Sequence, residues 1–182
     1  MHKTYDLWPD IAEKSYSEDL AQVDFKNISH VVLAGMGGSG TLHDIISSIL
    51  SKTNIHVSVI KGYHLPNTVD SETLVVTTSV SGNTSESLTV LDSAKKINCK
   101  VIAFSGGGKM KKYCNDNKIQ HRDIPIFHSP RASFPSFLFS MLRVLESVIP
   151  IKREDVVESI NSLKELQKKI SSQNLNLDNP SL

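Results

Sequence analysis

A chain of 182 residues is long enough to bury the core of one domain, and its 20 lysines and arginines nearly balance its 19 aspartates and glutamates. This balance gives no basis for nucleic acid or an anionic membrane as a partner, whereas small neutral or anionic ligands remain open. Two cysteines without Cys-x-x-Cys spacing, and no basic and then apolar segment at the N-terminus, favour a reduced, cytoplasmic protein.

The first elements are a helical arm over residues 1–28 and a strand, turn and helix over His30–Leu50. The second stretch begins with a β-branched apolar run, typical of a buried parallel strand, and ends with apolar residues at helical spacing. Its turn holds four glycines in six positions: Gly35, Gly37, Gly38 and Gly40. Because glycine lacks a Cβ atom and a helix begins with unpaired N–H groups, this turn can receive an anionic or oxygen-rich ligand.

Strands and helices continue to alternate along the chain. Further strands are predicted at 56–60, 73–78, 101–104 and around 124–127, with helices at 85–97, from the glycines at 106–108 to about 115, at 134–149 and at 153–170. This alternation predicts an α/β fold, a three-layer α/β/α sandwich around a parallel sheet. Eight of the nine glycines follow the first, third and fourth strands, so we expect a ligand site at their common edge.

The apolar helix predicted at 134–149 is too short to span a bilayer, which needs about 20 apolar residues, and it contains Arg143 and Glu146. We therefore expect it to lie in the core, with part of its surface available to a second subunit or domain. The polar segment 171–182 is interpreted as a linker.

The sequence Ser79-Val-Ser-Gly-Asn-Thr84 stands between the third strand and the next helix. Three hydroxyl groups and a flexible glycine beside a helix start can surround a phosphate, so Ser79, Ser81 and Thr84 are candidate phosphate ligands. The alternative is an ordinary turn in which Thr84 only caps the helix.

Other ligand classes fit the sequence less well. The glycine spacing from Gly35 to Gly40 matches a dinucleotide fingerprint, but the second strand ends in Lys61 rather than the acidic residue that would bind ribose. The glycines at 106–108 lack the spacing of a P-loop, and Thr41 replaces the last glycine of a Gly-x-Ser-x-Gly hydrolase turn. The seven histidines show no paired ligand spacing, so neither a metal nor a cofactor is expected.

Four motifs together resemble the sugar isomerase (SIS) domain family. They are Gly-Met-Gly-Gly-Ser-Gly after the first strand, Ser-x-Ser-Gly-Asn-Thr-x-Glu after the third, Ser-Gly-Gly after the fourth, and Ser-Pro-Arg-Ala before the apolar helix. Within this family the chain is most similar to the N-terminal half of archaeal-type bifunctional phosphoglucose/phosphomannose isomerases. The resemblance implies a five-stranded parallel sheet in the flavodoxin-like order 2-1-3-4-5 and an SIS domain over residues 29–150, with 151–182 leading towards a second SIS domain.

The resemblance also implies roles for single residues. The phosphate of a hexose phosphate would contact Ser79, Ser81 and Thr84, while the sugar would lie at the loop of Gly37, Gly38 and Ser39. Arg131 would stabilise the enediolate of a metal-free aldose–ketose isomerisation that links glucose 6-phosphate and mannose 6-phosphate to fructose 6-phosphate. A helix-capping or carboxylate-pairing role is the alternative for Arg131.

In the family, the general base, a ring-opening histidine and a lysine belong to a second SIS domain, and the histidine comes from a partner subunit. We therefore expect this chain to bind a sugar phosphate better than it converts one, as a homodimer or beside a second SIS domain. The alternative is a binding module that senses a phosphosugar without catalysis. His128 is expected to be an ordinary loop histidine, and His43 and Asp44 to serve the helix dipole or packing.

Overall fold

The computed structural model describes residues 2–176 and 178–180. The strands are β1 (His30–Ala34), β2 (His56–Ile60), β3 (Thr73–Ser79), β4 (Lys100–Ser105) and β5 (Gln120–Asp123). The helices are α1 (His2–Asp6), α2 (Trp8–Ser17), α3 (Gly38–Leu50), α4 (Ser85–Lys95), α5 (Gly108–Asn117), α6 (Phe134–Val144) and α7 (Arg153–Ile170). The first residue of the predicted arm and residues 177, 181 and 182 of the predicted linker lie outside the described residues.

The five strands form one parallel sheet in the order β2-β1-β3-β4-β5, which confirms the predicted α/β fold and strand order. In the register of the sheet, Ala34 of β1 lies opposite Thr77 of β3, and Ser79 of β3 lies opposite Ser105 of β4. The loops that follow β1, β3 and β4 therefore leave the sheet at the same edge. Neighbouring strands are about 4.8 Å apart, so these loops begin within reach of one small ligand.

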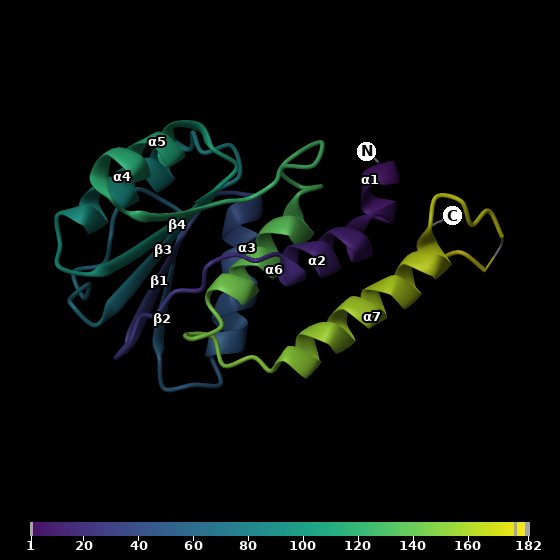
Figure 1. Ribbon diagram of the computed structural model, residues 1–182, viewed down its shortest axis with the longest axis horizontal. Coiled ribbons are helices and arrows are strands. Elements are labelled where there is room, and N and C mark those ends of the chain that lie inside the picture. The colour runs from purple at the N-terminus through teal and green to yellow at the C-terminus, as the bar shows by residue number, and fades with distance from the viewer. Residues whose placement is uncertain (1, 177, 181–182) are drawn as a thin grey trace.

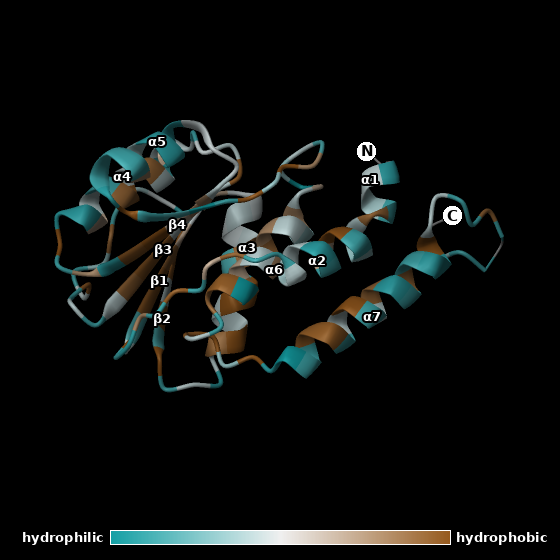
Figure 2. Cartoon of the chain, viewed as in Figure 1, coloured by the Kyte–Doolittle hydropathy of each residue, from teal (hydrophilic) through white to brown (hydrophobic). Residues whose placement is uncertain are grey.

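Helices cover both faces of the sheet, as Figure 1 shows, with α3 and α6 on one side and α4 and α5 on the other. Side chains that alternate along β1 and β3 divide between the faces: Leu33 and Val76 pack on the α3 and α6 side, whereas Val32 and Val75 pack against α4. Burial on both faces explains why these strands are apolar runs rather than alternating patterns. Figure 2 shows the result, hydrophobic strands at the centre of the molecule with hydrophilic residues on the outside of α4 and α5.

The N-terminal arm and α7 extend the side of the molecule that carries α6. Helix α2 packs against both α6 and α7, and its Ala12 and Tyr16 join the main core. Beyond α2 the chain is fixed to the end of α6 by a hydrogen bond from Val23 N–H to the carbonyl of Val144, at 3.0 Å. Helix α7 buries only Val156 and Ile160 and lies beside α2, away from the sheet (Figure 1).

The apolar helix α6 ends at Val144 rather than near residue 149 as predicted, and turns carry the chain through 145–149. Phe137 and Met141 of α6 are fully buried, and Leu145 and Ile149 of the following turns are also in the core. This chain therefore covers most of the apolar stripe by itself. Among the described residues, no helix is both long enough and apolar enough to cross a membrane.

The prediction of the fifth strand around 124–127 is wrong, because β5 forms at Gln120–Asp123. Strand β5 pairs only with β4 and lies at the edge of the sheet, where an apolar run is not required. Pro125 has no N–H group to continue the ladder, so the last bond runs from Ile124 N–H to the carbonyl of Ser105, at 2.9 Å. The apolar side chain of Ile126 instead lies over Gly106.

Candidate functional site

The glycine loop, residues 35–40, connects β1 to α3 and contains glycines of two kinds. A Cβ atom on Gly35 would lie 2.9 Å from the Ser39 Cβ, and one on Gly40 would lie 3.1 Å from the Gly35 carbonyl oxygen, so these two glycines allow close packing. A Cβ atom on Gly37 or Gly38 would meet nothing within 4 Å. Gly37 has a φ of 56° and immediately precedes α3, so the exposed part of this loop presents backbone at a helix N-terminus.

The hydroxyl loop, residues 79–84, connects β3 to α4 and is held by its own side chains. The hydroxyl groups of Ser79 and Thr84 are 2.8 Å apart, and Thr84 N–H donates to the Ser79 Oγ at 3.4 Å. Asn83 N–H donates to the Ser81 Oγ at 3.2 Å. Thr84 is the N-cap residue of α4, but its hydroxyl makes no capping bond. The first-turn N–H groups of α4 are thus left without a side-chain cap, as an anion site at this end would require.

The three candidate hydroxyl groups of this loop differ in accessibility. Ser81 is exposed and Thr84 is half-buried, whereas Ser79 is only 1% exposed. The structure therefore places Ser81 and Thr84 where a ligand can reach them and places Ser79 beneath them, against Thr84. Contact between Ser79 and a phosphate remains a prediction.

The third loop, residues 105–108, connects β4 to α5 and supports the hydroxyl loop from one side. Met110 N–H donates to the Gly82 carbonyl at 2.9 Å, and Lys109 N–H donates to the Asn83 Oδ1 at 3.2 Å. A Cβ atom on Gly82 would lie 1.9 Å from the Gly107 oxygen, a distance that no side chain can occupy. Gly82, and Gly108 with its added Cβ 2.6 Å from the Ser81 oxygen, therefore allow contact between the two loops, whereas a Cβ atom on Gly107 would meet nothing within 4 Å.

Arg131 lies in the turn that precedes α6, and its side chain is exposed. The Ser133 hydroxyl fixes this turn, because it accepts a bond from Phe127 N–H at 2.8 Å and donates to the Ser129 carbonyl at 2.8 Å. Within the described part of the chain, Arg131 forms no ion pair, so its guanidinium is available to a ligand. The alternative role of pairing with a carboxylate is not what the structure shows.

Arg131 and the exposed glycines line one cavity of about 660 Å³. The cavity is lined by Tyr5, Trp8, Gly37, Gly38, Thr41, Arg131 and Phe134. The structure thus brings together three of the seven predicted site residues. Ser39 is 5% exposed in the first turn of α3 and does not line this cavity. No residue of the hydroxyl loop lines it either, although that loop follows β3, the strand next to β1, at the same edge of the sheet. Tyr5 and Trp8 were not predicted as site residues, because they belong to no motif and the sequence of the arm indicates only a helix packed on the domain.

His43 lies beneath the glycine loop and ties it to β3. Its Nε2 is 2.9 Å from the Thr78 Oγ1, and its Cε1 is 3.0 Å from the position of a Gly35 Cβ. Burial of the ring lowers the pKa of His43 from 6.5 to about 3; Asp44 opposes this shift and Lys61 adds to it. His43 is therefore neutral at physiological pH and supports the loop, in line with the packing role expected for it. His128 is exposed.

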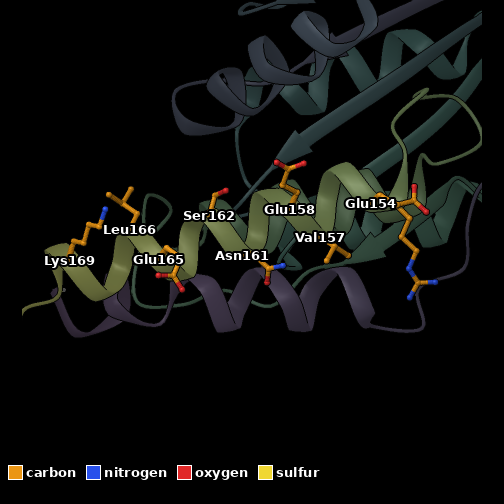
Figure 3. Close-up of a pocket in the computed structure, with 9 residues that line it drawn as sticks. Glu154, Val157, Glu158, Asn161, Ser162, Glu165, Leu166 and Lys169 are labelled. Carbon is orange, nitrogen blue, oxygen red and sulfur yellow. The ribbon is translucent and has the colours of Figure 1, made fainter.

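A larger hollow of about 800 Å³ runs along α7, far from the loops. Figure 3 shows that its labelled side chains, from Glu154 to Lys169, all come from this one helix, so the hollow is a helix face rather than an enclosed site. Among the residues that the structure describes, no group of three or more His, Cys, Asp or Glu side chains could hold a metal ion.

Known proteins are similar to this chain in sequence or in fold. The chain is 33% identical over 172 residues to a bifunctional phosphoglucose/phosphomannose isomerase of Caldicellulosiruptor bescii, an alignment that covers 93% of this chain and 48% of the relative. The C-terminal domain of glucosamine-fructose-6-phosphate aminotransferase from Francisella tularensis superposes with a TM-score of 0.63 at 14% identity, covering 92% of this chain and 53% of that one. A putative phosphosugar isomerase from Clostridium difficile superposes with a TM-score of 0.61 at 17% identity, covering 91% and 52%. The chain is a homologue of the bifunctional phosphoglucose/phosphomannose isomerases, with the SIS fold.

The comparisons confirm the predicted resemblance to SIS domains. The chain spans about half the length of the curated relatives that it matches. No family model matches the chain.

Proposed function

We propose that this chain is the sugar-phosphate-binding SIS domain, corresponding to the N-terminal half, of a bifunctional glucose-6-phosphate/mannose-6-phosphate isomerase. One observation carries the proposal: Gly37, Gly38 and Arg131, which forms no ion pair with the described residues, line one cavity at the edge of the sheet from which the hydroxyl loop also leaves. Helix N-termini, hydroxyl groups and a permanently charged guanidinium are the groups that bind a phosphorylated sugar and its anionic intermediate.

In this proposal the phosphate binds at the hydroxyl loop, where Ser81 and Thr84 donate hydrogen bonds and Ser79 orients Thr84. The sugar extends towards the glycine loop and Arg131. Isomerisation opens the ring, moves a proton from C2 to a general base and returns it to C1, with an enediolate between the two steps. Arg131 stabilises the negative oxygen of this enediolate, which forms only after the proton has left.

The general base must come from outside the cavity. Of the described residues that line it, none carries a carboxylate or an imidazole. This observation supports a chain that binds hexose phosphates alone and converts them when a second SIS domain, in the same protein or a partner, supplies the base. It equally favours the second candidate function, a module that senses a phosphosugar without converting it.

Calorimetric titration of the full chain with fructose 6-phosphate, followed by an assay for glucose 6-phosphate and mannose 6-phosphate, tests the proposal. We expect the chain alone to bind the sugar phosphate. We expect turnover when a relative is added that has an intact second SIS domain but has lost the arginine equivalent to Arg131. Arg131→Ala should abolish this turnover, whereas Arg153→Ala, which removes an exposed arginine of α7, should not. Binding without turnover in either setting supports the sensing module, and absence of binding contradicts both functions.

A further inference from the structure

Two aromatic side chains of the N-terminal arm form one side of the cavity that contains Gly37, Gly38 and Arg131. Tyr5 is near the end of α1, Trp8 begins α2, and both are half-buried. The polar groups of the cavity come from the SIS domain, whereas this wall comes from the arm. The arm thus reaches the rim of the sheet at the candidate site.

The wall is fixed to the turn that carries Arg131. The Trp8 Nε1 donates a hydrogen bond to the carbonyl of Ala132 at 3.0 Å. The Trp8 ring stacks on Phe134 with the ring centres 6.4 Å apart and an angle of 27° between the planes. Tyr5 meets Trp8 edge-on, with the ring centres 5.0 Å apart and an angle of 85°. Such contacts between three rings hold the wall in one geometry before a ligand arrives.

The arm is also fixed at its far side. Ser172 N–H, just beyond α7, donates to a carboxylate oxygen of Asp6 at 3.1 Å, and the Ser172 hydroxyl donates to the other oxygen. Tyr5 is therefore next to Asp6, which is bonded to the C-terminal segment, and its ring contacts Trp8, which is bonded to the turn of Arg131. The aromatic wall behaves as a built part of the site rather than as a loose terminus.

We propose that Tyr5 and Trp8 are specificity-determining residues that bind the carbon face of a hexose phosphate. This inference rests on the proposed function and deepens it. A sugar ring exposes C–H groups on one face and hydroxyl groups at its edge, and ligand pockets commonly pair an aromatic surface with a few directional polar groups. With the C–H face against Tyr5 and Trp8, the hydroxyl groups meet the glycine loop and Arg131. The wall then adds affinity for the hexose part of the ligand and none for its phosphate.

Trp8 is the only tryptophan in the sequence, so its fluorescence reports on this wall alone. We would titrate the full chain with fructose 6-phosphate and with inorganic phosphate, and follow Trp8 emission together with calorimetric affinity. Fructose 6-phosphate should change the emission, and inorganic phosphate at equal occupancy should leave it nearly unchanged. Tyr5→Ala should weaken fructose 6-phosphate about fivefold and leave the affinity for inorganic phosphate, measured by competition, unaltered.

Two further variants separate the wall from general effects on the arm. Tyr5→Phe keeps the ring and should keep the wild-type affinity. Leu166→Ala removes an exposed apolar side chain from a neighbouring groove of about 390 Å³ that Tyr5 and Trp8 also line, and it should change neither ligand's affinity.

The outcomes distinguish failure of the proposal for Tyr5 and Trp8 from failure of the proposed function. If fructose 6-phosphate binds without any change in Trp8 emission and Tyr5→Ala retains its affinity, the wall is contradicted and the proposed function stands. Equal weakening of fructose 6-phosphate and inorganic phosphate by Tyr5→Ala also contradicts a role in sugar selection. If wild-type protein binds no hexose phosphate, the proposed function fails, and the wall fails with it.

Discussion

The glycine loop and the hydroxyl loop leave neighbouring strands at one edge of the sheet, yet they use glycine in opposite ways. A side chain on Gly38 would enter open space, whereas one on Gly82 would overlap the backbone of the third loop. The hydroxyl loop is held by hydrogen bonds to itself and to the first turn of α5, while the outer part of the glycine loop faces a cavity.

The glycines of the two loops therefore have different roles, one in ligand access and the other in packing between loops. At Gly37 and Gly38 the missing side chain leaves room in which a ligand can approach the backbone, and at Gly82 it allows two loops to pack. Stability and ligand affinity should therefore respond to different substitutions on the two loops. The following predictions test this separation.

The largest effect is expected for Gly82→Ala. Gly82 has a φ of 67°, and the added Cβ would lie 1.9 Å from the Gly107 oxygen. A left-handed backbone costs alanine about 1–2 kcal/mol, and overpacking adds about 1–3 kcal/mol, so the free energy of unfolding should fall by about 2–5 kcal/mol. Urea unfolding of the variant measures it. Wild-type stability would contradict the contact between the loops.

The glycine loop rests on His43, so its support should depend on pH. The pKa of His43 is about 3 in the folded chain and 6.5 ordinarily, so between these values only the unfolded state binds the proton. The stabilisation is complete above pH 6.5 and is lost as the pH falls towards 3, by about 1.4 kcal/mol per pH unit. His43→Gln should remove this slope, so that between pH 6.5 and 4.5 its free energy of unfolding falls by about 2 kcal/mol less than that of the wild type.

Comparison of the two proteins isolates His43, because His30 and His121, whose pKa values are also lowered by burial, remain in both. Equal slopes in the wild-type protein and His43→Gln would show that the ring is protonated in the folded chain or is not buried.

Ser81→Ala tests ligand binding at the hydroxyl loop. The Ser81 side chain is exposed, and its removal costs the loop only the bond from Asn83 N–H. If Ser81 donates to a phosphate oxygen, affinity for fructose 6-phosphate should fall by about 1.5–3 kcal/mol, while stability changes little. Calorimetry and urea unfolding of the same variant measure the two effects. Unchanged affinity would place the phosphate elsewhere.

The smallest change in stability is expected for Gly38→Ala, the counterpart of Gly82→Ala. Gly38 has no left-handed φ and no neighbour within 4 Å of an added Cβ, and it lies at the start of a helix. Alanine should leave the free energy of unfolding within about 1 kcal/mol of the wild type, with a gain expected. The methyl group would nevertheless enter the cavity and weaken fructose 6-phosphate. A large loss of stability in Gly38→Ala would contradict the claim that only the hydroxyl loop needs glycine for packing.

Local patterns predicted most of this fold correctly. The run from His30 to Ala34 and the glycines that follow it fixed the first strand and turn, because a strand buried on both faces needs continuous apolar residues. The same rule misplaced the fifth strand, since β5 is a polar edge strand and the apolar residues Ile124 and Ile126 lie beyond it.

The site was predicted in part for a similar reason. Gly37, Gly38 and Arg131 belong to recognisable sequence motifs. They could therefore be predicted as site residues before the structure placed them in one cavity. Tyr5 and Trp8 lie more than 100 residues from Arg131 in the sequence, and only the packing of α2 on α6 brings them there. The burial of Ser79 likewise follows from its place at the end of β3, opposite Ser105 of β4, which its own motif does not mark.

A titration of isotopically labelled chain with fructose 6-phosphate, followed by amide chemical shifts, tests most directly whether the two loops form one site. We predict that the amides of Gly37, Gly38 and Ser81 shift together with one dissociation constant, and that those of the α7 face in Figure 3 do not move. Shifts confined to α7, or different dissociation constants for the two loops, would contradict a single sugar-phosphate site at this edge of the sheet.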